Sequence, residues 1–161
     1  MPSKRRTGYH TGGTVHPPAS GGGNLGIGAS VALNISNTTA TARIADTAVI
    51  TGTINDITLS ADSISKATTT STAGGAAAGG SGVGIGGAIA TSVVSNDTQA
   101  VLGSGGLQTV SGDLKAVATH TGGTTTFADG SAGGSSAGIG IALGLNVVSD
   151  TTLATTRRTI N

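Results

Sequence analysis

The sequence predicts an all-β chain folded as a parallel β-solenoid with repeats of about 54–58 residues, a period typical of stacked repeat architectures. Three observations support this fold class: an apolar run that occurs three times, an alternation of large and small residues within each run, and a composition that disfavours helices. A chain that repeats one supersecondary unit at this scale stacks its copies, so that neighbouring copies bury each other's apolar faces.

The repeated run reads GIGASVALNI at Gly26–Ile35, GIGGAIATSV at Gly84–Val93 and GIGIALGLNV at Gly138–Val147. A second motif recurs at a similar separation, as ITLSA at Ile57–Ala61 and LKAVA at Leu114–Ala118. These spacings define one structural unit that is used more than twice.

Large and small side chains alternate within each run. A period of two residues places one set on each face of a β-strand, whereas a helix would gather neither set on one side. We expect the large residues to fill a core and the Gly/Ala face to let another backbone approach closely. The predicted core comprises Ile27, Val31, Leu33, Ile35, Ile85, Ile89, Val93, Ile139, Leu143 and Val147. Val31→Asp or Leu143→Asp is therefore expected to unfold or disperse the chain.

Each repeat is expected to contain three or four short strands. Polar clusters follow the three apolar runs, at 36–39, 95–98 and 149–152, and we interpret them as turns, with Asp97 and Asp150 in equivalent positions.

The chain divides into a leader and a repeat domain. Residues 1–22 carry a basic start, two prolines and three glycines without periodicity, and are expected to be flexible. Residues 23–161 are expected to form the solenoid. Its repeats are expected at about 24–81 and 82–136, with a partial third at 137–161. An uncapped last coil exposes an edge for strand pairing, so this boundary is interpreted as a truncation or an assembly interface.

Composition excludes several classes of protein. The chain has 29 Gly, 1% aromatic residues and seven acidic residues that are all Asp, a residue typical of turns rather than helices. Without Cys there is neither a disulfide framework nor a thiolate metal site. A net charge of +1 does not favour nucleic-acid binding. No apolar stretch follows the basic residues 4–6, so no secretory signal peptide is predicted.

The order of these motifs resembles a known class of protein. GIGASVALNISNTTATARI, ITGTINDITLSADS and ATTTSTAGGAAAGGSGVGIGGAIATSVVSNDT follow one another as in the passenger regions of large bacterial surface proteins. These are the filamentous-haemagglutinin-like and leukotoxin-like adhesins and autotransporters. The resemblance covers roughly residues 24–156. It implies a right-handed parallel β-solenoid, export from the cell and a role as stalk or adhesive surface, and it transfers no catalytic residue.

Glycine- and histidine-containing motifs do not predict a ligand site. Gly82, Gly84 and the pair at 86–87 lie within a strand-like alternation, which favours close backbone packing over a phosphate-binding loop. His10 and His16 lie in the leader and His120 is alone in the body, so exposed polar roles are expected. His120→Ala is expected to change nothing measurable. The Asp residues lack the period of calcium-binding repeats.

We therefore assign no catalytic, cofactor-binding or metal-binding residue, and we expect no cofactor and no enzymatic activity. Ser and Thr are abundant but occur without a nucleophile-elbow motif, and the Asp residues are scattered. The basic groups at 4–6 and 157–158 are interpreted as solvated. The uncharged window 67–96 keeps the strand period, so membrane insertion is not expected.

The sequence thus predicts a structural repeat module of a bacterial cell-surface adhesin or an extracellular self-assembling fibre. The expected partner is a second copy, by end-to-end or lateral strand pairing, with a host surface or glycan as a further partner. One alternative is a ligand-binding solenoid wall for carbohydrate or ice, because Thr triplets recur at 68–70 and 124–126. Another is a membrane-active Gly-rich protein.

Overall fold

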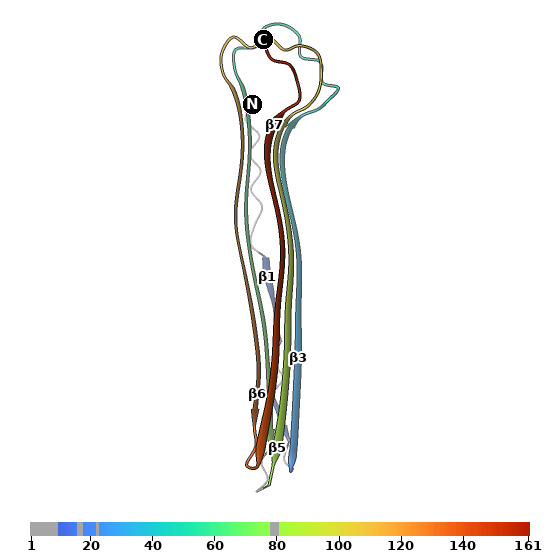
Figure 1. The fold of residues 1–161 in the computed structure, drawn as a ribbon, viewed down its shortest axis with the longest axis vertical. Helices are drawn as coiled ribbons and strands as arrows, with labels where there is room; N and C mark the ends of the chain where they lie inside the picture. The colour runs from blue at the N-terminus through green and yellow to red at the C-terminus, as the bar shows by residue number, and fades with distance from the viewer. Residues whose placement is uncertain (1–9, 16–17, 22, 78–80) are drawn as a thin grey trace.

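Long parallel strands make up most of the molecule in the computed structural model, which describes residues 10–15, 18–21, 23–77 and 81–161 (Figure 1). The described strands are β1 (His10–Val15), β2 (Pro18–Gly21), β3 (Leu25–Ile44), β4 (Ile57–Ala77), β5 (Val83–Leu102), β6 (Leu114–Gly133) and β7 (Ala137–Thr156). Five of them are 20 or 21 residues long, which corresponds to roughly 65 Å of extended chain.

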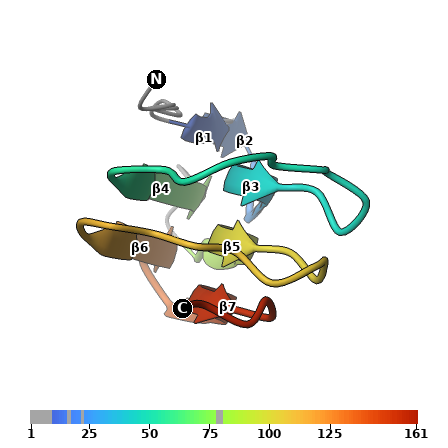
Figure 2. The same cartoon turned by 90° about the horizontal axis from the view of Figure 1, so that it is seen from above.

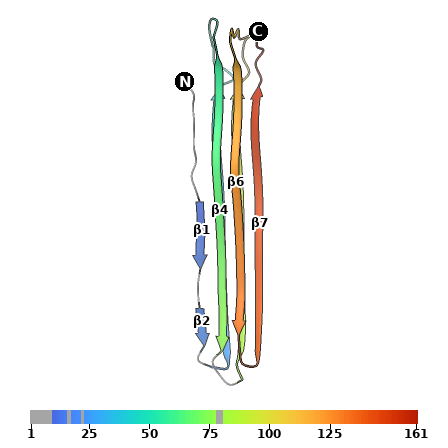
Figure 3. The same ribbon diagram turned by 90° about the vertical axis from the view of Figure 1, so that its left-hand side faces the viewer.

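The strands form two parallel sheets that face each other. Sheet A contains β4 with β6 on one side and β1 and β2 on the other, whereas sheet B has the order β3-β5-β7. Figure 2 shows the two sheets from above as two adjacent stacks. The chain runs along sheet B in one direction and returns along sheet A in the other (Figure 3). β3 and β4 thus form one flattened coil of two long strands, β5 and β6 form the next, and β7 is the first strand of a third.

The predicted fold class, an all-β parallel solenoid built from stacked repeats, is confirmed. Ile27 pairs with Ile85, and Ile85 pairs with Ile139, in an unbroken register along the full length of the three strands. In sheet A, Ile57 pairs with Leu114. The repeats seen in the sequence are thus the hydrogen-bonded neighbours of the fold.

The predicted division of each repeat into three or four short strands is wrong. The polar clusters 36–39, 95–98 and 149–152 lie inside β3, β5 and β7, and the connections lie at 45–56 and 103–113. In a parallel stack each polar residue meets its register partner in the next coil, as Asn96 donates a hydrogen bond to Asp150. The predicted equivalence of Asp97 and Asp150 is therefore wrong, because Asp97 pairs with Thr151. Ser36 and Thr38 of the first cluster are buried without a hydrogen-bond partner among the described residues, so the parallel pairing of the strands, and not a turn, decides where these residues lie. Gly52, with φ of 86°, does lie in a connection.

Along the half of sheet B that carries the repeated runs, small residues line the space between the sheets and the large aliphatic residues point outward. The predicted core is therefore wrong. Eight of its ten members are exposed: Ile27, Val31, Leu33, Ile35, Ile89, Ile139, Leu143 and Val147. The other two, Ile85 and Val93, are half-buried. The alternation was correctly recognised, but the opposite face points inward. Burial therefore gives no reason for Val31→Asp or Leu143→Asp to unfold the chain.

Glycine explains this inversion at one end of the sheets. A Cβ atom added at Gly28 would overlap the carbonyl of Gly74, and one added at Gly86 would overlap the carbonyl of Ser131. The two backbones lie so close that no methyl group fits between them, let alone an isoleucine. The larger side chains can therefore only point outward. Gly84 and Gly86 are close-packing positions as predicted, whereas Gly87 is not, because it points outward and a Cβ there would meet no atom within 4 Å.

Among the described residues, the aliphatic core cluster lies at the opposite end, next to the long connections. It comprises Ala42, Ile57, Leu59, Ala61, Ala100 and Leu102, with Leu102 fully buried. Between the two ends, buried Ser, Thr and Asn side chains such as Ser30, Thr69 and Asn96 fill the interior. The interior thus changes from backbone contact through a polar middle to an aliphatic end.

Part of the expected leader forms strands. β1 and β2 lie within residues 1–22 and pair with β4 at residues 67–71 and 74–77, so they continue sheet A beyond the first coil (Figure 3). The expectation of flexibility for residues 1–9, 16–17 and 22 lies outside the described residues.

Replacing either of two adjacent glycines tests the backbone contact between the sheets. Gly86→Ala forces a methyl group against a backbone carbonyl and is expected to lower the free energy of unfolding by about 1–3 kcal/mol. Gly87→Ala is the matched control, because a Cβ there meets no atom within 4 Å. Urea denaturation followed by circular dichroism measures both. Equal stability of the two variants would contradict the inward orientation of the small residues.

Candidate interaction surface

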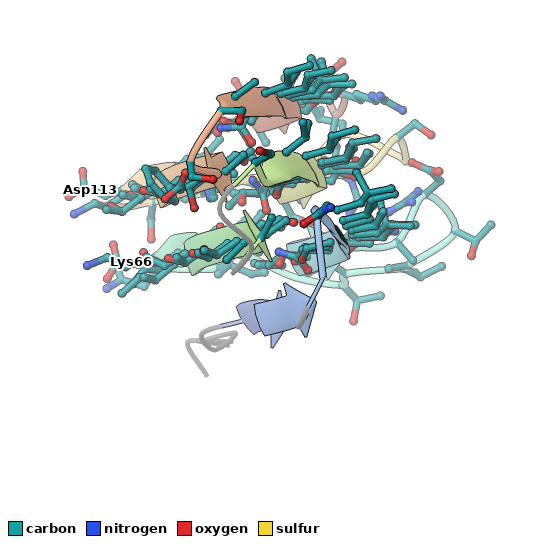
Figure 4. All side chains as sticks on the ribbon, turned by 90° about the horizontal axis from the view of Figure 1, so that it is seen from below. Lys66 and Asp113 are labelled. Carbon is teal, nitrogen blue, oxygen red and sulfur yellow. The ribbon has the colours of Figure 1, made fainter. Side chains whose placement is uncertain are left out.

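The outward side of sheet B carries a continuous aliphatic surface, which we call the apolar face. It consists of the odd-numbered positions of 25–35 in β3, 83–93 in β5 and 137–147 in β7. Thr91 is the one polar residue among these positions, and none is charged or aromatic. Figure 4 shows the side chains of β3, β5 and β7 projecting away from sheet A as a dense block of carbon.

The apolar face is exposed to an unusual degree. The exposed fraction is 72% for Ile35, 65% for Ile141 and 62% for Val31. Three strands of eleven residues cover a plane of roughly 500 Å², which lies within the range of the largest apolar patch on an ordinary monomer, about 300–600 Å². Such patches mark interaction sites, so this face is the principal candidate functional surface.

The apolar face ends sharply along the strands. In the next rows, Asn37, Ser95 and Ser149 lie side by side, and Gln99 donates two hydrogen bonds of 2.8 Å to the carboxylate of Asp97. The aliphatic half lies over the glycine-lined end of the interior. Large side chains are therefore concentrated outside the sheets where they cannot fit inside.

The outward side of sheet A is polar and irregular. Lys66 projects from it, as Figure 4 shows, and faces Gly123 in the neighbouring strand. The Thr triplets do not form a ladder here. Thr68 is outside and pairs with Thr125, but Thr69 is fully buried and Thr70 pairs with Phe127. The regular Thr array on which the ice-binding alternative depended is absent from these described strands.

A polar cluster in the interior joins four strands. Ser63 Oγ lies 2.6 Å from Thr98 Oγ1 and 2.7 Å from His120 Nδ1, while His120 Nε2 lies 3.6 Å from Asp150 Oδ1. Asp150 in turn accepts the hydrogen bond from Asn96. The His120 side chain is only 8% exposed, so the expected exposed role for His120 is wrong. His120 is buried because it is the register equivalent of Ser63, one coil further along sheet A.

This cluster contains Ser, His and Asp, the residue types of hydrolase triads, but its geometry favours structural cross-linking. Ser63 is 1% exposed and shares its hydroxyl with Thr98, so a substrate has no path to a nucleophile there. The cluster gives partners to some of the polar groups that the narrow interior buries, whereas His120 Nε2 and Asn96 Oδ1 have no hydrogen-bond partner among the described residues.

A second set of polar contacts fastens the connections at the aliphatic end. Arg158 is 5% exposed, so the expectation that it is solvated is wrong. Its guanidinium donates hydrogen bonds of 3.0–3.5 Å to the carbonyls of Ala45, Ala48, Gly103 and Ser104. One side chain thereby links the connections of three successive coils.

Asp46 belongs to the same region. The hydrogen bond from the backbone N–H of Ser104, 2.9 Å long, lowers the pKa of the Asp46 carboxyl below its ordinary value. Desolvation opposes this shift, and the positive charge of Arg43, its salt-bridge partner, adds to it. Asp46 therefore stays ionised and holds the two connections in register.

Other expected sites have the following outcomes. Within the described residues no group of three or more His, Cys, Asp or Glu could hold a metal ion. The same residues include no helix with the length and hydropathy that a membrane crossing needs. The side chain of His10, and all of His16 and the basic residues 4–6, lie outside what the structure describes. No protein-family model, curated protein or solved structure matches the chain.

His120→Ala tests the structural role of the polar cluster. It removes the hydrogen bond to Ser63 and leaves a void, so we expect the free energy of unfolding to fall by about 1–3 kcal/mol. Thr119→Ala, at an adjacent exposed position, is the control. Thermal unfolding monitored by circular dichroism distinguishes them, and an unchanged midpoint for His120→Ala would restore the exposed interpretation.

Proposed function

We propose that this chain is a structural repeat module of a bacterial cell-surface adhesin or extracellular self-assembling fibre, and that it extends by adding coils end to end. The proposal places the chain outside the cell and gives it no catalytic role. Its resemblance to adhesin passenger regions supports the class of protein. The observation that supports end-to-end growth is the exposure of the inward side of β7, the last strand.

β7 presents inward the same small residues that are buried in β5. Gly138, Gly140 and Ala142 are the register equivalents of Gly84, Gly86 and Ala88. The three residues of β5 are buried between β4 and β6, whereas those of β7 are exposed because, of the described strands of sheet A, β6 alone covers them. A surface built for backbone contact is thus open on one side. One more strand of sheet A would bury it.

Both edges of sheet B are open as well. Within the described residues, β3 and β7 each pair with β5 alone. Their unpaired N–H and C=O groups can add a further parallel strand. If β7 of one copy pairs with β3 of the next in the register of the fold, Ile139 meets Ile27 and Gly140 meets Gly28. This contact joins different surfaces of the two copies, so it repeats without closing and produces a filament.

Gly144→Asp tests this growth without disturbing the chain itself. A Cβ at Gly144 has no neighbour closer than 3.8 Å, yet its equivalent in β5, Ala90, is fully buried by neighbouring coils. The added carboxylate would be buried by an incoming coil without a counter-charge, which is costly. We expect filaments of the unmodified chain by negative-stain electron microscopy and only short particles for Gly144→Asp.

Gly123→Asp is the matched control. It adds the same charge to the outward side of sheet A, beside Lys66 and with no atom within 4 Å of its Cβ, so its filaments are expected to match those of the unmodified chain. An unmodified chain that stays a discrete particle at all concentrations would contradict the proposed function, as would unimpaired filaments of Gly144→Asp.

A further inference from the structure

We infer that the apolar face binds the same face of a second copy of this chain, so that two solenoids pack side by side through sheet B. This inference goes beyond end-to-end growth, because it concerns the outward side of the sheet and not its edges. Four features of the apolar face carry it: its chemistry, its area, its flatness and the distribution of large and small residues across two of its rows.

The chemistry of the face fits another protein surface of the same kind. Homodimer interfaces have apolar centres depleted of charge, and the apolar face has no charged residue. A surface that docks on lipid typically combines basic residues with Trp, Phe or Leu, and on sheet B the one basic residue, Arg43, lies four rows beyond Ile35, outside the apolar face. The apolar face also lacks the aromatic and basic side chains that stack on or attract other ligands.

The area approaches that of the smallest specific interfaces. Two copies of a plane of roughly 500 Å² bury about 1,000 Å² together before the relief of the side chains is counted. Specific interfaces begin at about 1,200 Å² in total accessible surface, and relief adds to the plane area. The three strands keep one register throughout, so the face is even enough for a second sheet to pack at the usual spacing of about 10 Å.

Two of the six rows of the face have a large residue at one edge and a small residue at the other. One row reads Leu25, Val83, Ala137, and the row four residues further reads Ala29, Gly87, Ile141. The order of the large and the small residue is opposite in the two rows.

A two-fold axis parallel to the strands uses this pattern. It lays β3 of one copy over β7 of the other and β5 over β5. Leu25 then faces Ala137 of the partner subunit, and Ile141 faces Ala29 of the partner subunit. At both edges of these two rows a large residue meets a small one, whereas on the central strand Val83 faces Val83 of the partner subunit and Gly87 faces Gly87 of the partner subunit.

Gly87→Asp tests the inference at the centre of the face. Because a Cβ at Gly87 meets no atom within 4 Å, the variant is expected to fold as the unmodified chain does. The carboxylate would be desolvated in the pair, so we expect the dimer dissociation constant to rise about tenfold or more in sedimentation velocity. Gly123→Asp, on the outward side of sheet A, is the control and is expected to leave that constant unchanged.

Electron microscopy of the same variants separates this inference from the proposed function. Filaments two solenoids wide that become one solenoid wide in Gly87→Asp support both. Dimers that Gly87→Asp dissociates, without filaments of any variant, support the inference and contradict end-to-end growth. An unmodified chain that stays monomeric overturns the inference, whether or not it floats with phosphatidylcholine vesicles. So does an equal dimer constant for Gly87→Asp and the control.

A cross-link tests the orientation of the pair. The chain has no Cys, so Gly87→Cys supplies one thiol at the position where β5 faces β5. A bismaleimide that spans about 10 Å is expected to join two copies of Gly87→Cys but not two copies of Gly123→Cys. Equal cross-linking of the two variants would overturn the two-fold arrangement.

Discussion

The contact between the two sheet backbones is the constraint on which the rest of the structure depends. Glycines such as Gly28 and Gly86 leave no room for a Cβ between the sheets, because the opposing carbonyl already occupies that space. The interior can therefore hold only small residues at this end, and the aliphatic residues of the same strands lie outside. The close contact between the two backbones thus explains both the thin interior and the apolar face.

A thin interior changes how the fold is held together. Few aliphatic residues are buried, and Leu102 and Ile57 belong to a small cluster at the end with the connections. The stability of the fold therefore depends more on backbone hydrogen bonds between long parallel strands and on buried hydroxyls. It also depends on single side chains such as Arg158, which link several coils. The same features leave an aliphatic face and strand edges exposed, and surfaces of both kinds favour association in general.

The repeat and the alternation of large and small residues could be predicted from the sequence. Which of the two sets points into the space between the sheets could not. The spacing of Ile27, Ile85 and Ile139 was sufficient for the register, and the alternation for the strands. The inward side depends on the opposing strand, because residues 74–76 of β4 lie against Gly26 and Gly28 of β3. The alternate small residues of β4, such as Ala73 and Gly75, were the available signal. His120 was likewise identifiable as the equivalent of Ser63 in the preceding repeat.

The most direct test of the account compares two adjacent residues of β3 that point to opposite sides. Ile35 is 72% exposed and Ser36 is 4% exposed. The chain has no Cys, so Ile35→Cys and Ser36→Cys each introduce a single thiol whose labelling rate can be measured in dilute, monomeric protein. The account predicts rapid labelling of Ile35→Cys and strong protection of Ser36→Cys. Protection of Ile35→Cys with rapid labelling of Ser36→Cys would contradict it.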